Sequence, residues 1–205
     1  STRPMHARHT KIARPDMGTW GRQEWAILGT PCEPIRSLAE ALAQSLSPSC
    51  KVGYADADHA DARKGTSPLL PFTTQYTDKI DYTRFDRQRT LHLYEARMQM
   101  READIVLVNG NHFTARRQIL VLDRRKMDSL SRKTERLTEV DLLITLPDDA
   151  HGFSPEEMPS FLKEHLPHWR NIPVRSLSDT DAIAALLQSR CAPPPVHGLV
   201  LAGGR

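Results

Sequence analysis

The chain has 205 residues, of which 39% are hydrophobic and 26% are charged, which is ordinary usage for a globular protein. Its formal net charge of +3 is too small to indicate nucleic-acid binding, and no apolar run approaches the ~18 residues of a membrane-spanning helix. The sequence opens with no signal-peptide pattern, so we expect a cytoplasmic protein without a nucleic-acid or membrane partner. The cysteines, Cys32, Cys50 and Cys191, lie far apart in no metal-binding spacing, which excludes a disulfide framework and a zinc site.

Residues 1–24 are polar and basic, and turn-forming residues recur along them. This composition predicts an N-terminal arm laid against the body of the protein. As a phosphate-binding arm it would use Lys11, Arg14 and Arg22; the alternative is a solvated tail that happens to be basic.

Residues 25–46 carry the strongest local pattern in the chain. A short apolar run ends at Gly29, and apolar side chains then recur at helical spacing from Ile35 to Leu46. This order predicts a strand, a tight loop and a helix, an arrangement whose backbone N–H groups bind phosphate in many α/β proteins. The predicted phosphate-binding loop consists of Gly29, Thr30, Pro31, Cys32 and Glu33.

The side chains of this loop depart from the P-loop pattern G-x-x-x-x-G-K-[ST]. Counted from Gly29, the last three places hold Pro34, Ile35 and Arg36. The second glycine, the phosphate-binding lysine and the magnesium-binding hydroxyl are therefore all missing, and the loop is a degenerate P-loop.

The next predicted strand, residues 50–55, runs into Asp56, Asp58 and His59. Open α/β sheets bind their ligands beyond the carboxyl ends of the strands, so these side chains are expected beside the loop that follows the first strand. Carboxylates and an imidazole there indicate a site for a hydrated magnesium ion or for a phosphate. The alternative is that Asp58 caps the segment that follows and the others face solvent.

Residues 103–108 form a continuous apolar run, which predicts a central parallel strand covered on both faces. The run leads directly into Asn109, Asn111 and His112, which we expect to line the same crevice. Asn109 stands where P-loop proteins commonly carry an acidic residue that orients water on the metal, and this exchange argues against nucleotide hydrolysis.

The remaining elements complete the expected fold. Residues 73–85 predict a β-hairpin that turns at Asp78-Lys79, and residues 87–101 predict a helix with Leu91, Tyr94 and Met98 toward the core. Further strands are expected at residues 118–122, 140–146 and 172–175, and further helices at residues 125–137, 155–166 and 179–190. Alternating strands and helices predict an α/β fold, namely a three-layer sandwich with a mainly parallel sheet, P-loop NTPase-like, with a β-hairpin insertion.

The composition changes after the last predicted helix. Residues 191–196 form a proline-rich linker, and residues 197–205 begin a new apolar strand that ends in Gly-Gly-Arg. The segment GLVLAGGR resembles the opening of molybdenum cofactor guanylyltransferases, whose first strand ends in a loop around the incoming nucleotide. The resemblance implies a domain of residues 25–190 followed by the start of a nucleotidyltransferase domain.

The body resembles the GTP-binding accessory protein of molybdopterin-guanine dinucleotide synthesis. The resemblance rests on the order of parts and on the segments HTKIARPDMG, WAILGTPC, YADADH, YTDKI and VNGNHF, which are similar to a fusion of such a domain with a transferase domain. It implies binding of GTP with Mg²⁺, or of the pterin phosphate of molybdopterin, in support of the transferase domain. It also implies a homodimer.

Two alternatives of other classes stay open. The first is an inactive docking module, which a crevice blocked by Pro31, Pro34 or a neighbouring side chain would indicate. The second is an independent small-molecule enzyme that uses Cys32 or His112. The enzyme would need a nucleophile and a base within about 3 Å of each other.

Overall fold

The computed structural model describes residues 18–58 and 72–191. The first residues of the predicted basic arm, His59, and the segment 192–205 with its resemblance to a transferase lie outside the described residues. Within the described ranges, no helix has the length and apolar character needed to cross a membrane.

A six-stranded parallel sheet forms the centre of the fold. Its first strand, β1, is an inner strand, and Trp25 of β1 lies opposite Leu107 on one side and Arg117 on the other. The sheet therefore places the carboxyl ends of all six strands along one edge. In spatial order the strands are β2 (Val52–Ala55), β5 (Ile105–Asn109), β1 (Gln23–Leu28), β6 (Arg117–Leu122), β7 (Val140–Thr145) and β8 (Val174–Ser176).

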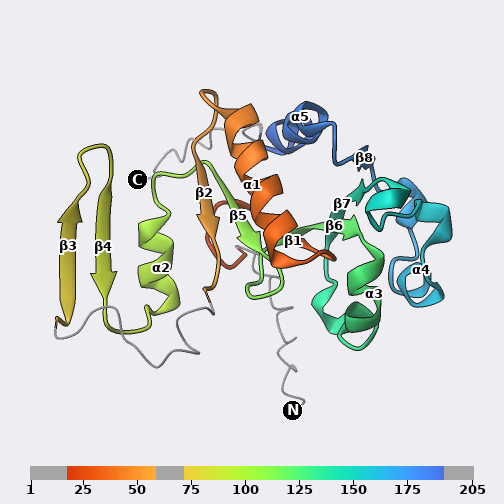
Figure 1. Ribbon diagram of the computed structural model, residues 1–205, viewed down its shortest axis with the longest axis horizontal. Helices are drawn as coiled ribbons and strands as arrows, with labels where there is room; N and C mark the ends of the chain where they lie inside the picture. Colours follow the sequence, from red (N-terminus) through yellow and green to blue (C-terminus); the bar gives the residue numbers. More distant parts are fainter. Residues whose placement is uncertain (1–17, 59–71, 192–205) are drawn as a thin grey trace, which may run out of the picture.

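Helices cover both faces of this sheet, so the fold has the three predicted layers (Figure 1). On β6, Ile119 and Val121 pack against α1 (Cys32–Leu46) and α5 (Thr180–Arg190). The alternate residues, Leu120 and Leu122, pack on the opposite face against α3 (Arg124–Ser131) and α4 (Ser160–His165). This alternation follows from the period of two along a strand.

Helix α1 forms as its apolar spacing predicts. The five buried side chains on one face are Ile35, Leu38, Ala39, Leu42 and Leu46. The helix begins at Cys32 after Pro31, and Glu33 lies in its first turn, where a carboxylate interacts favourably with the helix dipole.

The β-hairpin is present, but the predicted turn is wrong. Strands β3 (Thr74–Asp78) and β4 (Thr83–Arg87) pair so that Asp78 lies opposite Thr83, and residues 79–82 form the turn. The Asp78 carboxylate accepts the Ile80 N–H at 2.9 Å, which draws the bend to the residues that follow it.

Helix α2 (Leu93–Gln99) is shorter than predicted, and two of the predicted core positions, Tyr94 and Met98, are wrong, whereas Leu91 is half-buried. Tyr94 is 66% exposed and Met98 is 57% exposed. In Figure 1 the helix and the hairpin lie to the side of β2, which is an edge strand of the sheet. Only Ala96 and Met100 pack against the core there.

Two other predicted helices are interrupted. The segment 155–166 divides at Pro159 into a 3-10 turn, η3 (Pro155–Glu157), and α4. The segment 125–137 divides into α3 and a second 3-10 turn, η1 (Thr134–Arg136). Despite its many charged residues, α3 buries Met127 and Leu130. The remaining 3-10 turns are η2 (Asp148–Ala150) and η4 (Trp169–Asn171).

Candidate functional site

The predicted phosphate-binding loop follows β1 and leads into α1. Gly29 has a φ of +89°, and a Cβ placed there would lie 2.4 Å from the Val121 carbonyl oxygen. Since side chains are strained at this φ and the strand leaves no space, the position requires glycine. On the other side of β1, the Gly110 N–H donates to the Ile27 carbonyl at 2.8 Å, and a Cβ on Gly110 would meet the same oxygen at that distance. Two glycine-containing loops therefore lie side by side at the carboxyl edge.

Thr30 connects the loop to the next strand of the sheet. Its hydroxyl donates to a carboxylate oxygen of Asp123 at 2.6 Å, and both residues are buried. Burial opposes ionisation of Asp123, but hydrogen bonds from Arg125, Thr30 and the Arg125 N–H outweigh it and lower the pKa of the carboxyl. The Thr30 side chain thus fixes the loop, and the backbone N–H groups of the loop stay available for the predicted ligand.

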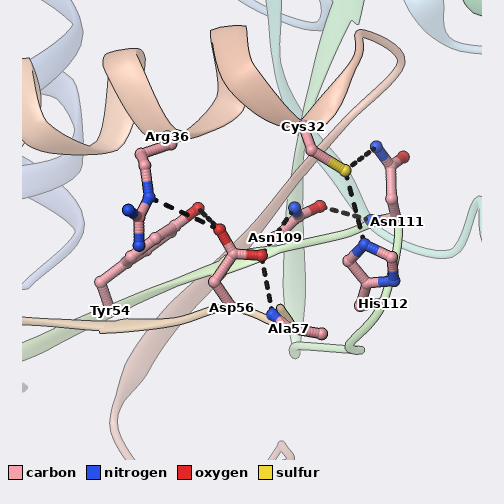
Figure 2. Close-up of polar contacts among 8 residues, drawn as sticks. All are labelled: Cys32, Arg36, Tyr54, Asp56, Ala57, Asn109, Asn111 and His112. Carbon is pink, nitrogen blue, oxygen red and sulfur yellow. Dashed lines mark hydrogen bonds and ion pairs between the residues drawn. The ribbon is translucent and has the colours of Figure 1, made fainter. Parts of the chain in front are cut away.

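Asp56, at the end of β2, is held by a cluster of donors (Figure 2). Its carboxylate accepts from the Tyr54 hydroxyl at 2.9 Å, from Asn109 Nδ2 at 2.9 Å and from the Ala57 N–H at 2.8 Å, and Arg36 Nε lies 3.8 Å away. Burial opposes its ionisation, but these donors lower the pKa of Asp56 overall. Burial and the bond to Asp56 raise the pKa of Tyr54, so the pair is an anionic acceptor and a neutral donor.

Asn109 joins this cluster to the loop after β5. It is completely buried, its Nδ2 donates to Asp56, and its Oδ1 accepts the Asn111 N–H at 3.0 Å. Asn111 Nδ2 in turn donates to the Thr30 carbonyl at 3.1 Å. One chain of hydrogen bonds therefore links the carboxyl ends of β2, β5 and β1.

Cys32, the first residue of α1, lies against the β5 loop (Figure 2). Its Sγ is 3.4 Å from His112 Nε2 and 3.5 Å from Asn111 Nδ2. The structure thus brings together the predicted loop residues and the predicted residues Asn109, Asn111 and His112.

A cavity of about 390 Å³ lies beside this cluster, and we call it the acidic cavity. Three carboxylates line it, those of Glu33, Asp56 and Asp58, together with one cation, Arg36. Carboxylate oxygens are the ligands that Mg²⁺ prefers, so the donor chemistry suits this ion. Within residues 18–58 and 72–191, however, no three His, Cys, Asp or Glu side chains group closely enough to hold a metal directly. The cavity is lined by Cys32, Glu33, Arg36, Asp56, Ala57 and Asp58.

A second hollow lies on the β6 side of the loop, and we call it the basic cavity. It lies between the two glycine loops and the α3–η1 segment, and no carboxylate lines it. Its lining consists of Leu28, Gly29, Gly110, Asn111, Lys126, Ser129, Lys133, Leu130 and Arg136.

The sequence reasoning missed the basic residues of this cavity. A signal was present, because Lys126, Ser129, Lys133 and Arg136 recur every three or four residues, as on one face of a helix. Arg22, by contrast, does not approach the site. It precedes β1 at the opposite edge of the sheet, where it donates to the carbonyl groups of Met100 and Arg101.

Comparison with known proteins identifies the fold. The sequence matches no family model and no curated protein. Among solved structures, the chain is similar to a MobB protein homolog from Bacillus stearothermophilus, with 18% identity and a TM-score of 0.52 over 82% of this chain and 97% of that one. It is also similar to MobB from Bacillus subtilis, with 11% identity and a TM-score of 0.54 over 82% and 97%. The predicted α/β, P-loop NTPase-like fold is confirmed.

Proposed function

We propose that this domain binds a nucleotide or a pterin phosphate at the carboxyl edge of its sheet and is an accessory domain of molybdopterin-guanine dinucleotide synthesis. The observation that carries the proposal is the bridge through Asn109, which joins Asp56 to Asn111 beside the glycine loop. The sequence resemblance and the likeness of the fold to MobB structures support the assignment to this biosynthesis.

Each predicted residue has a role in this proposal. Backbone N–H groups of residues 29–33 bind phosphate at the positive end of α1. Asp56 and Asp58, together with His59, hold a hydrated magnesium ion, which supplies positive charge to the phosphate oxygens. Asn109 keeps Asp56 in place, and Asn111 and His112 contact the bound ligand. GTP is the nucleotide that the resemblance favours.

Transfer chemistry belongs to a partner in this proposal. The partner is a nucleotidyltransferase domain of the kind that residues 197–205 resemble, and the accessory domain is a homodimer. The transferase joins a nucleoside triphosphate to the pterin phosphate and releases pyrophosphate, while the domain described here binds one of the ligands.

Isothermal titration of the chain with GTP, ATP and GDP, with and without magnesium, tests this function. We expect micromolar binding that is lost in the Asp56→Ala and Asn109→Ala variants and retained in Asp81→Ala, whose side chain lies in the remote hairpin turn. Absence of heat with every nucleotide, from protein with intact secondary structure, contradicts nucleotide binding and leaves pterin phosphate or docking.

Two observations bear on the alternatives. No proline lines the acidic or the basic cavity among the described residues, so neither cavity is bounded by Pro31 or Pro34, one of the signs expected of a docking module. The distance of 3.4 Å between Cys32 Sγ and His112 Nε2 favours thiol chemistry as a second candidate function. If the protein turns over an ester or phosphate substrate, and Cys32→Ser and His112→Gln each abolish that turnover, the second candidate replaces the first.

A further inference from the structure

The degenerate loop receives no phosphate-binding cation from its own helix. Ile35 stands at the place of the P-loop lysine, and it is completely buried in the core under α1. Arg36 stands at the next place, and its Nε lies 3.8 Å from Asp56, so its charge serves the acidic cavity. A phosphate on this loop therefore needs cations from another element.

The α3–η1 segment carries such cations on the other side of the loop. Lys126, Lys133 and Arg136 all line the basic cavity together with Gly29 and Gly110. Lys126 is half-buried, whereas Lys133 and Arg136 are exposed at the mouth. Three cations thus surround one hollow between two glycine loops.

The three cations have no carboxylate partner among the described residues. Two other arginines of the same segment do: Arg125 forms an ion pair with Asp123 at 2.7 Å, and Arg132 forms one with Asp128 at 2.7 Å. Unneutralised like charges that converge on one concave surface attract an anion to it.

Arg136 lies where the basic cavity meets two further hollows. It donates to the Asn111 carbonyl at 3.1 Å, and it lines a hollow of about 100 Å³ beneath the β5 loop. It further lines a larger hollow of about 620 Å³, where Glu135 and Glu139 are the acidic residues. Because no carboxylate lines the basic cavity, whereas Glu135 and Glu139 offset the charges of Arg116 and Arg136 in the larger hollow, an anionic group is favoured more strongly beside Gly29.

We propose that the basic cavity binds the phosphate or diphosphate group of the ligand, and that Lys126 and Lys133 replace the missing P-loop lysine. The inference rests on the proposed function, whose phosphate it locates on the β6 side of the loop. The cavity holds about 20 Å³, enough for a water-sized group, so phosphate enters only when the exposed Lys133 side chain moves aside. Arg136 is a positioning residue, because it holds the Asn111 carbonyl.

The test uses inorganic pyrophosphate as the probe, without magnesium and at low salt, in titrations of the full 205-residue chain. The variant is Lys126→Gln with Lys133→Gln, and the matched control is Arg132→Gln, which removes one exposed cation from the end of the same helix. We expect the double variant to bind pyrophosphate at least tenfold more weakly, since a hydrogen bond to a charged group contributes about 1.5 kcal/mol or more and 1.4 kcal/mol is tenfold. The control should stay within about twofold.

The outcomes separate this inference from the proposed function. If wild type and double variant bind GTP equally, while Asp56→Ala does not bind it, the function stands and the lysine site is overturned. If pyrophosphate binding depends on the two lysines but no nucleotide or pterin phosphate binds, the lysine site stands and the proposed function falls. Wild-type protein that does not bind pyrophosphate at millimolar concentration overturns the lysine site, provided that circular dichroism shows all variants folded.

Discussion

The two cavities that flank the glycine loop differ both in charge and in how their side chains are held. In the acidic cavity, Asp56 is fixed by three hydrogen bonds, one of them from a completely buried asparagine. In the basic cavity, Lys133 and Arg136 are exposed, and the ion pairs of the described segment use other arginines. Hydrogen bonds within the protein therefore fix the Asp56 carboxylate of the acidic cavity, whereas the exposed side chains of the basic cavity have more conformational freedom.

In the proposed function, a loop that lacks the P-loop lysine still binds phosphate, and the two cavities supply the missing groups. A P-loop combines backbone donors, a cation and a metal-binding hydroxyl within eight residues. In the proposed site these parts are distributed: the backbone donors lie in the loop, the carboxylates proposed to hold the metal follow β2, and the proposed phosphate-binding cations belong to α3 and η1. The functional elements are separate in sequence, and only the parallel sheet brings them together.

The largest effect should come from a change in the glycine loop itself. Gly29→Val places a Cβ 2.4 Å from the Val121 carbonyl at a φ that side chains avoid, so we expect destabilisation of about 4 kcal/mol in urea unfolding. Gly21→Ala is the control, because its φ is also positive, at +68°, but its nearest atom lies 3.9 Å away; it should cost about 1 kcal/mol. If both variants lose a similar unfolding free energy, the space between Gly29 and the Val121 carbonyl accommodates a side chain, which contradicts this prediction.

Removal of the buried carboxylate that holds Thr30 should have the next largest effect. Asp123→Ala leaves the Thr30 hydroxyl and Arg125 without their acceptor, which should cost about 3 kcal/mol of unfolding free energy. Because the pKa of Asp123 is lowered in the folded protein, its contribution is complete above the unfolded pKa of about 4 and is lost as the pH falls below it. The difference between wild type and variant should therefore shrink between pH 7 and pH 3, and a constant difference contradicts this account.

Thiol labelling should distinguish which cavity a ligand occupies. Cys32 is exposed and lines the acidic cavity, whereas burial raises the pKa of the Cys191 thiol to about 11. Iodoacetamide at pH 8 should modify Cys32 at least about tenfold faster than Cys191, as measured by peptide mass spectrometry. Magnesium nucleotide should slow the labelling of Cys32 more than pyrophosphate does; equal protection would indicate that both ligands lie against the thiol.

The smallest effect should come from Arg36→Gln. The ion pair with Asp56 spans 3.8 Å and the Arg36 side chain is 60% exposed, so its loss should change the unfolding free energy by less than about 0.5 kcal/mol. Pyrophosphate affinity should change less than about twofold, since this cation lies in the other cavity. A tenfold loss would locate the phosphate against Arg36 instead of the lysines.

Strong periodic patterns predicted the inner part of this fold. The apolar run of β5 and the helical face of α1 are buried as expected, and the residues after β1, β2 and β5 lie together because parallel strands end at one edge. Helix α2 shows where such reasoning ends. Its Tyr94 and Met98 have core spacing, but spacing does not reveal which face of a helix at the edge of the sheet contacts the core; here Ala96 does, and Tyr94 and Met98 are exposed.

The sequence predicted only those candidate site residues that directly follow β1, β2 and β5. The Asp123 carboxylate and the lysines of the basic cavity follow β6, and their role depends on which strand lies next to β1. The spacing of Lys126, Lys133 and Arg136 indicates a shared helix face, but a charged face usually points to solvent. Only the order of strands shows that this face lies against Gly29.

The position of β1 between β5 and β6 has a consequence for how the chain folds. Trp25 pairs with Leu107 and Arg117, so the first strand pairs with strands that follow it by roughly 80 to 90 residues. Closing loops of that length before any contact is gained slows folding. During synthesis β1 is made well before β5 and β6, so its backbone N–H and C=O groups have no partners in the sheet until those strands follow.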